Sequence, residues 1–306
     1  MPTPHLSTGF ADLLDPRFQK VFFEQYGQLP DMVPTLFNMT PHNNRNSMLF
    51  SQVGALGDWE DFGGTVLYDN MSQGYDTTVT YLEFVKGIQI ERKLFDDDQY
   101  NIMDQRPRGM ALSAQRTRQK QAARMLNNAF SVDNYFYVNS EAVALCSNSH
   151  TTTASGASTA SGFDNLTTAA LSATAVASAR IQMVGFRDDR ANRISVMPDE
   201  LWYPPDLYDV AYEIVESSGR PDSAENNANV QKGRWKTHEW NYMTDANNWF
   251  MCDSAMRKMS LHWVDRIPLE FGYVEDFDTF LGKWRGYYRA ANAHTDWRFI
   301  LGAQVS

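Results

Sequence analysis

The amino-acid sequence predicts an α+β fold in which helices and strands follow one another without regular alternation. Three observations carry this prediction: a helical apolar stripe within residues 107–130, a threonine- and tyrosine-rich β-segment over 63–94, and short aromatic strands beyond residue 234. Because there are no repeated strand–helix–strand units, a doubly wound parallel sheet is not expected. The 306 residues, 43% of them hydrophobic, suffice for one large domain or two moderate ones.

The composition favours contacts with protein over contacts with nucleic acid. The formal net charge is −10, whereas proteins that bind nucleic acid tightly usually present a basic face, because counterion release from phosphate drives that binding. Phe, Tyr and Trp make up 13% of the chain, and aromatic side chains are enriched where proteins associate. We therefore expect an assembling protein that does not bind DNA tightly.

The first 55 residues are expected to be irregular. Prolines are scattered through them, a polar cluster runs from Pro41 to Asn46, and a short helix is expected only around Pro16–Tyr26. A segment of this length without periodicity usually needs other structure, or other subunits, to hold it.

Residues 63–94 are expected to form a long β-hairpin. Thr65–Tyr68 predicts the first strand, Asp69–Gly74 a turn, and Tyr75–Val85 the returning strand, which Gly87 then interrupts. Apolar side chains occur on both faces of this segment but are diluted by threonine. Since a two-stranded hairpin is only marginally stable alone, we expect it to lie between neighbouring molecules.

Residues 107–130 form the clearest helix of the sequence. Pro107 suits a first helical turn, and apolar residues recur at helical spacing. The stripe consists of Ala122, Met125, Leu126 and Ala129, closed by Phe130.

The same helix is strongly basic. Six basic residues and no acidic one lie between Arg106 and Ser131: Arg106, Arg108, Arg116, Arg118, Lys120 and Arg124. Those at 116, 120 and 124 are four residues apart and line one face. The stripe is interpreted as pairing with acidic surfaces of neighbouring subunits, as facing DNA, or as a solvated helix face, which is the usual fate of such a run.

A Ser/Thr/Ala/Gly loop at residues 147–162 predicts a boundary between two regions of the chain. Beyond it, Asp164 or Asn165 is expected to cap a helix that runs to Ile181.

The C-terminal half is expected to continue with short elements. Ile194–Met197 predicts a strand, and Pro204-Pro205-Asp206 opens a helix through Val215. Aromatic strands are expected around residues 235–240, 249–252, 261–264, 280–288 and 297–301.

The sequence lacks the motifs of known catalytic and metal sites. There is no phosphate-binding glycine loop, no zinc-binding helix motif and no nucleophile elbow. The closest Cys/His pair, Cys146 and His150, cannot fill a zinc site alone. Asp96–Asp98 is interpreted as a solvated turn rather than a Mg²⁺ site, and the acids Glu213 and Glu216 are expected to face water. We therefore expect no enzyme, with no catalytic, cofactor-binding or metal-binding residues.

The cysteines and the N-terminus indicate a cytoplasmic product. Cys146 and Cys252 lie far apart in sequence, so buried free thiols are expected rather than a disulfide-stapled secreted domain. The first ten residues have neither a basic start nor an apolar run, and no stretch approaches 18 apolar residues. We therefore expect no signal peptide and no membrane span.

Several different short motifs follow one another along the chain, each occurring once. They are Tyr68 with Gly74–Thr77, Phe84–Arg92, Ala142–Ser147 with His150, Met197–Leu207, Asn229–Gly233, Asp245 with Trp249, and Asp296–Arg298. No single motif is diagnostic, but in this order and spacing they resemble the major capsid (head) proteins of tailed bacteriophages, in particular the Mu-like head-subunit group. The similarity covers nearly the whole chain.

The resemblance implies the Hong Kong 97 capsid fold and its division into parts. These would be an N-terminal arm at 1–57, an extended loop at 58–100, a spine helix and peripheral domain at 101–163 with about 271–295, and an axial domain at 164–270 with about 296–306. In the same family, the segments at 142–147 and around 197–207 correspond to a strand and to a strand-to-helix junction.

The resemblance also implies a function. The chain would assemble as hexamers and pentamers into the icosahedral head that encloses double-stranded phage DNA, with a portal, a decoration protein and a separate scaffolding protein as partners. Because the chain begins close to the arm, we expect scaffolding to be supplied separately, or the chain to be the mature form already. Assembly would occur in the host bacterial cytoplasm, and the product would be part of the virion.

Two alternatives remain open at this point. One is an encapsulin-like compartment shell, which shares the fold but encloses protein cargo; the other is an α+β enzyme without a recognised motif. Some relatives cross-link subunits through a loop lysine and a distant asparagine. Lys86 and Lys93 lie near the base of the expected loop, so no cross-link is predicted.

Overall fold

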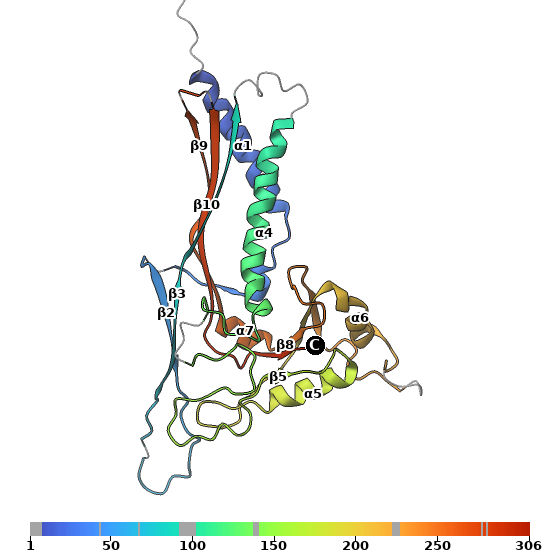
Figure 1. Ribbon diagram of the computed structural model, residues 1–306. Coiled ribbons are helices and arrows are strands. Elements are labelled where there is room, and N and C mark those ends of the chain that lie inside the picture. Colours follow the sequence, from blue (N-terminus) through green and yellow to red (C-terminus); the bar gives the residue numbers. More distant parts are fainter. Residues whose placement is uncertain are drawn as a thin grey trace, which may run out of the picture.

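The computed structural model describes residues 8–306 except 43, 67, 92–101, 137–140, 222–226, 277 and 280; the side chains of 8–15 and 102 are not described. Figure 1 shows an upright part, built of very long strands and two helices, above a second sheet with shorter helices. A separate two-stranded hairpin runs along one side and ends in a loop that extends below both parts. The predicted α+β class is confirmed.

The upright part contains a four-stranded sheet in the order β1-β9-β10-β4. Its strands are β1 (Asn38–Met39), β4 (Leu82–Glu91), β9 (Leu261–Asp276) and β10 (Leu281–His294). β10 pairs antiparallel with both β9 and β4, from Leu281 opposite Glu91 to Ala290 opposite Leu82 on the β4 side. Alternate residues of β10, Trp284 and Tyr288 among them, are buried toward the helices.

Two long helices cover that face of the sheet. α4 (Gln105–Asn127) follows a 3₁₀ turn, η1 (Ile102–Asp104), and buries Ala122, Met125 and Leu126, so the helix and apolar stripe predicted from sequence are confirmed. Gly286 of β10 lets α4 approach closely, because a Cβ atom there would lie 2.9 Å from Cε of Met110.

Helices and strands take up most of residues 8–53, which corrects the prediction of an irregular N-terminal segment and lengthens the short helix expected around Pro16–Tyr26. α1 (Thr8–Gln28) is a helix of 21 residues that contains Pro16, and it packs against α4. Phe18 and Phe22, four residues apart, are buried against Trp284 and Phe271. Burial of these aromatic side chains within the same chain outweighs the cost of an internal proline. α2 (Val33–Leu36) follows, with Val33 and Leu36 also buried.

The hairpin pairs different strands from those predicted. β3 (Gln73–Thr80) pairs with β2 (Ser47–Val53), a segment expected to be irregular, while no strand forms at 65–66 or at Tyr68. The register places Met48 opposite Val79. Beyond Tyr81 the chain enters β4, and Gly87 lies inside that strand opposite Arg285 rather than interrupting it.

The lower part is a five-stranded sheet in the order β5-β11-β8-β6-β7. The strands are β5 (Leu166–Thr167), β6 (Glu200–Tyr203), β7 (Lys236–Glu239), β8 (Trp249–Cys252) and β11 (Ile300–Ala303). The helices are α5 (Ala173–Val184), α6 (Tyr208–Glu216), which follows η2 (Pro205–Leu207), and α7 (Ser254–Ser260). The predicted helix through Val215 is confirmed, as are strands in all five aromatic segments.

Three local predictions in this half are wrong. α5 is capped by Ser172, whose hydroxyl accepts from the Ala175 N–H at 3.1 Å, because Asn165 is buried and the next two residues form β5. Residues 194–197 form no strand; the strand begins at Glu200. Residues 142–146 form no strand either, and Ala142 has a φ of +55°.

One hydrophobic core joins the two parts. It combines the C-terminal half of α4 with both faces of the lower sheet and the start of β9, including Leu126, Trp202, Trp249 and Trp263. Smaller clusters lie higher up, where α1 and α4 meet the long sheet, and beside the hairpin, where Val79 and Tyr81 pack on β9 and β10. Residues of both the predicted peripheral domain and the predicted axial domain therefore contribute to this one core.

Candidate interaction surfaces

The loop that joins β2 to β3, residues 54–72, presents aromatic side chains to solvent. Trp59 is 98% exposed, Phe62 77% and Tyr68 92%. The loop contains four acidic residues and no lysine or arginine: Asp58, Glu60, Asp61 and Asp69. Contiguous apolar surface of this kind is rare on monomers and marks a contact with another molecule. We call residues 58–62, with Trp59 and Phe62 among three carboxylates, the acidic tip.

The base of this loop is tied to the body of the molecule. Asp69 accepts hydrogen bonds from Arg190 Nη1 at 2.6 Å and from the Gly57 N–H at 2.8 Å. These bonds lower the pKa of Asp69 to about 2. Arg190 also donates to the carbonyl oxygen of Asn70 at 2.6 Å. Asp69 is therefore already paired, and the carboxylates of the acidic tip have no ion pair among the described residues.

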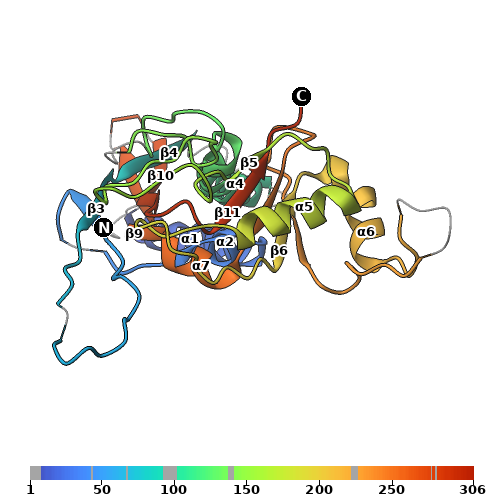
Figure 2. The same cartoon turned by 90° about the horizontal axis from the view of Figure 1, so that it is seen from below.

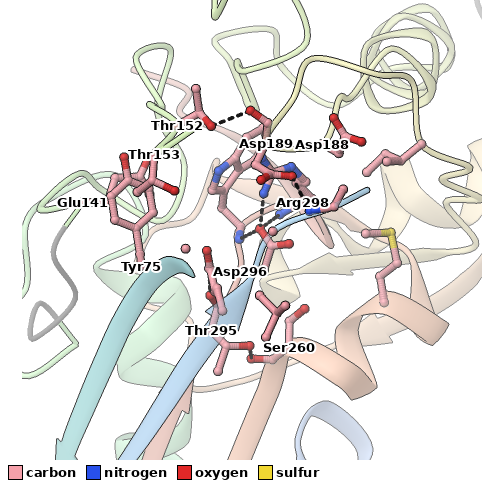
Figure 3. A pocket seen from close by; sticks show the side chains of 18 of the residues that line it. Tyr75, Glu141, Thr152, Thr153, Asp188, Asp189, Ser260, Thr295, Asp296 and Arg298 are labelled. Atoms are coloured by element: carbon pink, nitrogen blue, oxygen red, sulfur yellow. Dashed lines mark hydrogen bonds and ion pairs between the residues drawn. The ribbon is translucent and has the colours of Figure 1, made fainter. Parts of the chain in front are cut away.

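The root of the hairpin lies over a pocket of about 490 Å³, shown in Figure 3. Asp189 Oδ1 accepts from the Ala55 N–H at 2.8 Å, and its carbonyl accepts from the Thr152 hydroxyl at 2.6 Å. Tyr75 and Thr151 share a hydroxyl hydrogen bond of 2.6 Å. The low-complexity loop at 147–162, expected as a boundary, thus holds the hairpin against the body.

The acidic side chains around this pocket stabilise turns rather than forming a reactive site. Asp188 accepts from the backbone N–H groups of Arg190 and Asn192 at 2.9 and 2.8 Å. Asp296 similarly accepts from the Trp297 and Arg298 N–H groups. Within the described residues, no group of three His, Cys, Asp or Glu side chains is placed to hold a metal ion. The pocket is a junction between segments.

His150 has a structural position in this junction. Its Nδ1 lies 3.1 Å from Glu141 Oε1 and its Nε2 lies 3.1 Å from Asn165 Oδ1, while the ring stacks on Trp297 with centroids 4.1 Å apart. Both ring nitrogens are thus occupied. Cys146, its neighbour in sequence, is a buried free thiol, and burial raises its pKa.

Three other sequence features can be placed, and two cannot. Cys252 is also free and buried, and burial raises its pKa well above the ordinary value. Glu213 and Glu216 are exposed on α6, as expected. Asp96–Asp98 and Lys93 lie outside the described residues. Lys86 lies on β4, and its Nζ is 3.4 Å from the Ser113 hydroxyl of α4.

The basic residues of α4 fall into two groups. Arg118 binds Asp265 through two hydrogen bonds of 2.8 and 3.1 Å, and Arg124 binds Asp133 at 2.7 and 2.6 Å. The other four are exposed and make no ion pair with any described residue: Arg106, Arg108, Arg116 and Lys120. The predicted line of 116, 120 and 124 is thus broken, because Arg124 turns to a partner of its own chain.

The acidic tip was not predicted from the sequence. Its signal is the sequence Asp58-Trp59-Glu60-Asp61-Phe62, which combines charge with large aromatic groups outside any periodic pattern. Such a segment cannot be part of a core, because its carboxylates would be buried without partners. The chain also contains no helix, among those described, that is long and apolar enough to span a membrane.

Comparison with known proteins gives a family and a set of related folds. Residues 75–303 match the family model described as phage capsid protein. Similar solved structures include the mature capsid of bacteriophage PhiM1 (9% identity, 91% of this chain and 88% of that chain, TM-score 0.61). Others are the procapsid of bacteriophage JBD30 (12%, 98% and 76%, 0.53) and the capsid of cyanophage P-SCSP1u (16%, 88% and 86%, 0.52). None of the curated proteins compared matches the chain.

Proposed function

This chain belongs to the phage capsid protein family and is a structural protein of the virion shell, and we propose that it is the major subunit that self-assembles into an icosahedral head around double-stranded phage DNA. The alternative of an encapsulin-like compartment gains no support from the family match. The resemblance to the Mu-like group with the Hong Kong 97 fold stays a prediction, and so do the domain boundaries at 57, 100, 163 and 270.

The observation that carries the proposal is the exposed acidic tip on a hairpin that extends from the body. Figure 2, seen from below, has the loop projecting well beyond the rest of the molecule, at the opposite end from α6. Exposing Trp59 and Phe62 has a cost in water that burial against another molecule removes. Neighbouring copies of this chain, which are the most abundant partners in a shell, supply that cover.

The shape of the molecule favours association of the head-to-tail kind. A projecting loop that contacts a different surface of the next copy forms a heterologous interface, which closes into a ring when the rotation between copies fits. Rings of six and of five copies would be the hexamers and pentamers of the shell. Each contact then needs only a modest interface, on the order of 1,600 Å² of buried surface.

The DNA cargo and the accessory partners follow from the same proposal. A net charge of −10 suits a container that does not bind its cargo tightly, so contact with DNA would be non-specific. A scaffolding protein, a portal and a decoration protein would be further partners, and assembly would take place in the host bacterial cytoplasm. We propose no catalytic activity.

Purified wild-type protein tests the proposal. Light scattering should detect particles of hundreds of subunits, and electron microscopy should show closed shells. The variant with Trp59→Ser and Phe62→Ser should stay small, whereas Trp59→Phe with Phe62→Tyr, which keeps the aromatic groups, should still assemble. A wild-type protein that remains a monomer or small oligomer under all assembly conditions would contradict the proposed shell function. Normal shells from the serine variant would contradict the role of the acidic tip in assembly.

A further inference from the structure

We propose that a pocket between α4 and the long sheet binds a small aromatic acid that carries an oxygen atom on its ring. The pocket has a volume of about 130 Å³, and side chains of α1, α4, β4, β9 and β10 form its walls. We call it the Tyr288 pocket, after the tyrosine of β10 that lines it. The site lies within one chain, so the inference goes beyond the proposed shell function and does not depend on it.

The Tyr288 pocket has apolar walls and room for one ring. Phe22 and Met110 line it and are buried, and Leu269 beside them is partly buried. Two small residues, Ala114 of α4 and Gly286 of β10, also line the pocket and leave its space open. An apolar cavity of about 150 Å³ holds a benzene molecule. The Tyr288 pocket therefore fits an occupant with a single six-membered ring.

The hydroxyl of Tyr288 is a buried donor without an acceptor. Tyr288 is 7% exposed, and its hydroxyl has no hydrogen-bond partner among the described residues. The ring stacks on Phe84 with centroids 4.8 Å apart, which fixes its position. Burial raises the pKa of Tyr288, so the hydroxyl stays protonated. Because buried polar groups are nearly always paired in folded proteins, an oxygen atom on the ring of the ligand is expected to accept this hydrogen bond.

Lys86 gives the pocket a positive charge. It lies exposed on β4, and it is the one charged side chain among the described residues that line the pocket. Its Nζ donates to the Ser113 hydroxyl at 3.4 Å, a long contact that leaves two other N–H groups of the ammonium for an anion. With no carboxylate among the lining side chains, the charge of Lys86 favours a carboxylate on the ligand.

Water is the competing occupant of the Tyr288 pocket. A buried water needs about two to four polar partners. Besides Tyr288, the polar lining side chains are Lys86, Ser113 and Thr117, and the Thr117 hydroxyl already donates to the Ser113 carbonyl oxygen at 2.8 Å. One water molecule could accept from Tyr288, but it would leave the rest of the apolar volume without contacts. A ring with an oxygen substituent satisfies the hydroxyl and fills the volume together.

A bound ligand would connect elements that only small clusters hold together. Phe22 comes from α1, Met110 from α4 and Leu269 from β9, and this cluster is separate from the main core. A molecule in contact with all three binds the folded state and not the unfolded chain. It should therefore raise the temperature of thermal unfolding in proportion to its occupancy.

Titration of the purified full-length chain tests the proposal. The probes are meta- and para-hydroxybenzoate, with benzoate lacking the ring oxygen and hydroxybenzyl alcohol lacking the charge. Calorimetry should show one site for at least one hydroxybenzoate, and thermal unfolding should shift upward. The two incomplete probes should bind about tenfold more weakly. A pocket that holds water only would show no saturable binding of either hydroxybenzoate at about 10 mM, and this result would overturn the proposal.

Substitutions within the pocket then test where the probe binds. Tyr288→Phe should weaken hydroxybenzoate about tenfold and leave benzoate unchanged, because only the hydroxyl is lost. Lys86→Met should weaken both acids and leave hydroxybenzyl alcohol unchanged. Ala114→Leu, which fills the pocket, should abolish binding of every probe while circular dichroism shows the fold retained.

Lys120→Met is the matched control for the loss of a lysine. Lys120 is exposed on α4 but does not line the pocket, so its substitution should leave the affinity of every probe unchanged. If hydroxybenzoate bound equally well to the wild-type chain, to Tyr288→Phe and to Ala114→Leu, the site would lie elsewhere and the proposal would be overturned.

Discussion

Arg257 and Glu200 form a buried ion pair with two parallel hydrogen bonds, Nε to Oε2 at 2.8 Å and Nη2 to Oε1 at 2.9 Å. The remaining guanidinium nitrogen of Arg257 donates to the carbonyl oxygens of Thr35, at 2.7 Å, and Leu36. The pair thus connects α7 and β6 to the N-terminal segment. It explains why a segment expected to depend on neighbouring copies is held by its own chain at α2.

Loss of either partner of this pair should strongly destabilise the fold. Arg257→Met leaves a buried carboxylate without its cation and two carbonyl groups without a donor, so we expect a loss of about 3–5 kcal/mol in the free energy of unfolding. Urea denaturation of a variant kept unassembled measures it. Lys236→Met, which breaks the exposed pair with Asp199, should cost less than about 1 kcal/mol. Similar losses for both variants would show that burial of the Arg257 pair adds nothing.

The free energy of unfolding should fall in strong acid, because Glu200 is then protonated. Burial alone would raise the pKa of Glu200. The adjacent His238 ring and Arg257 guanidinium lower it by more, so that the pKa falls from an ordinary value of 4.5 to about 2. Because the folded state holds the proton more weakly, the stabilisation is complete above pH 4.5 and is lost as the pH falls toward 2. It amounts to roughly 3 kcal/mol. Unfolding free energies measured from pH 5 to 2 should therefore drop less steeply in Glu200→Gln, and an equal slope would contradict this.

His294 should make the free energy of unfolding depend on pH in a less acidic range than Glu200 does. Burial lowers the pKa of His294 from 6.5 to about 4, with a small opposing effect from Glu141. Its Nδ1 has no hydrogen-bond partner among the described residues, and its ring lies 5.9 Å from that of Phe136. Stability should fall between pH 6.5 and 4, by roughly 3 kcal/mol, because the unfolded chain takes up the proton first. Between pH 6.5 and 4, the stability of His294→Phe should fall less than that of the wild-type protein; an unchanged profile would exclude His294 as the cause.

Substitution of Asn165, at the junction beneath the hairpin, should lower the stability of the fold. Its Oδ1 accepts from the Ser147 N–H at 2.8 Å and faces His150, while its Nδ2 donates to the carbonyl oxygens of Leu145 and Ile300 at 2.8 and 3.1 Å. Asn165→Leu would leave these buried groups unpaired, at about 1–3 kcal/mol each.

Thermal and urea unfolding of Asn165→Leu should show this loss. Asn247→Leu, at an exposed asparagine, is the matched control and should change stability by less than about 0.5 kcal/mol. If Asn165→Leu proved as mild as the control, the four hydrogen bonds would not hold the junction.

The elements that the sequence alone predicts are those whose signal is local. The stripe Ala122, Met125 and Leu126 identifies α4 because helical periodicity depends only on neighbours along the chain. The helix at 208–216 and the aromatic strands were found in the same way, and the order of motifs was sufficient for the family. The acidic tip was not predicted because residues 58–62 have neither helical nor strand periodicity.

What the tertiary structure alone decided is which distant segments meet. Residues 47–53 contain no strong β-pattern, yet they pair with β3 because Met48 and Phe50 reach a cluster formed by β3, β9 and β10. The same holds for Phe18 and Phe22, which are buried against Trp284 and Phe271 of the long sheet in a helix that continues through Pro16. It also holds for Asn165, which donates to the carbonyl oxygen of Ile300, more than 100 residues away. Such contacts depend on the free energy gained where segments converge in space, and a pattern within one segment does not contain that information.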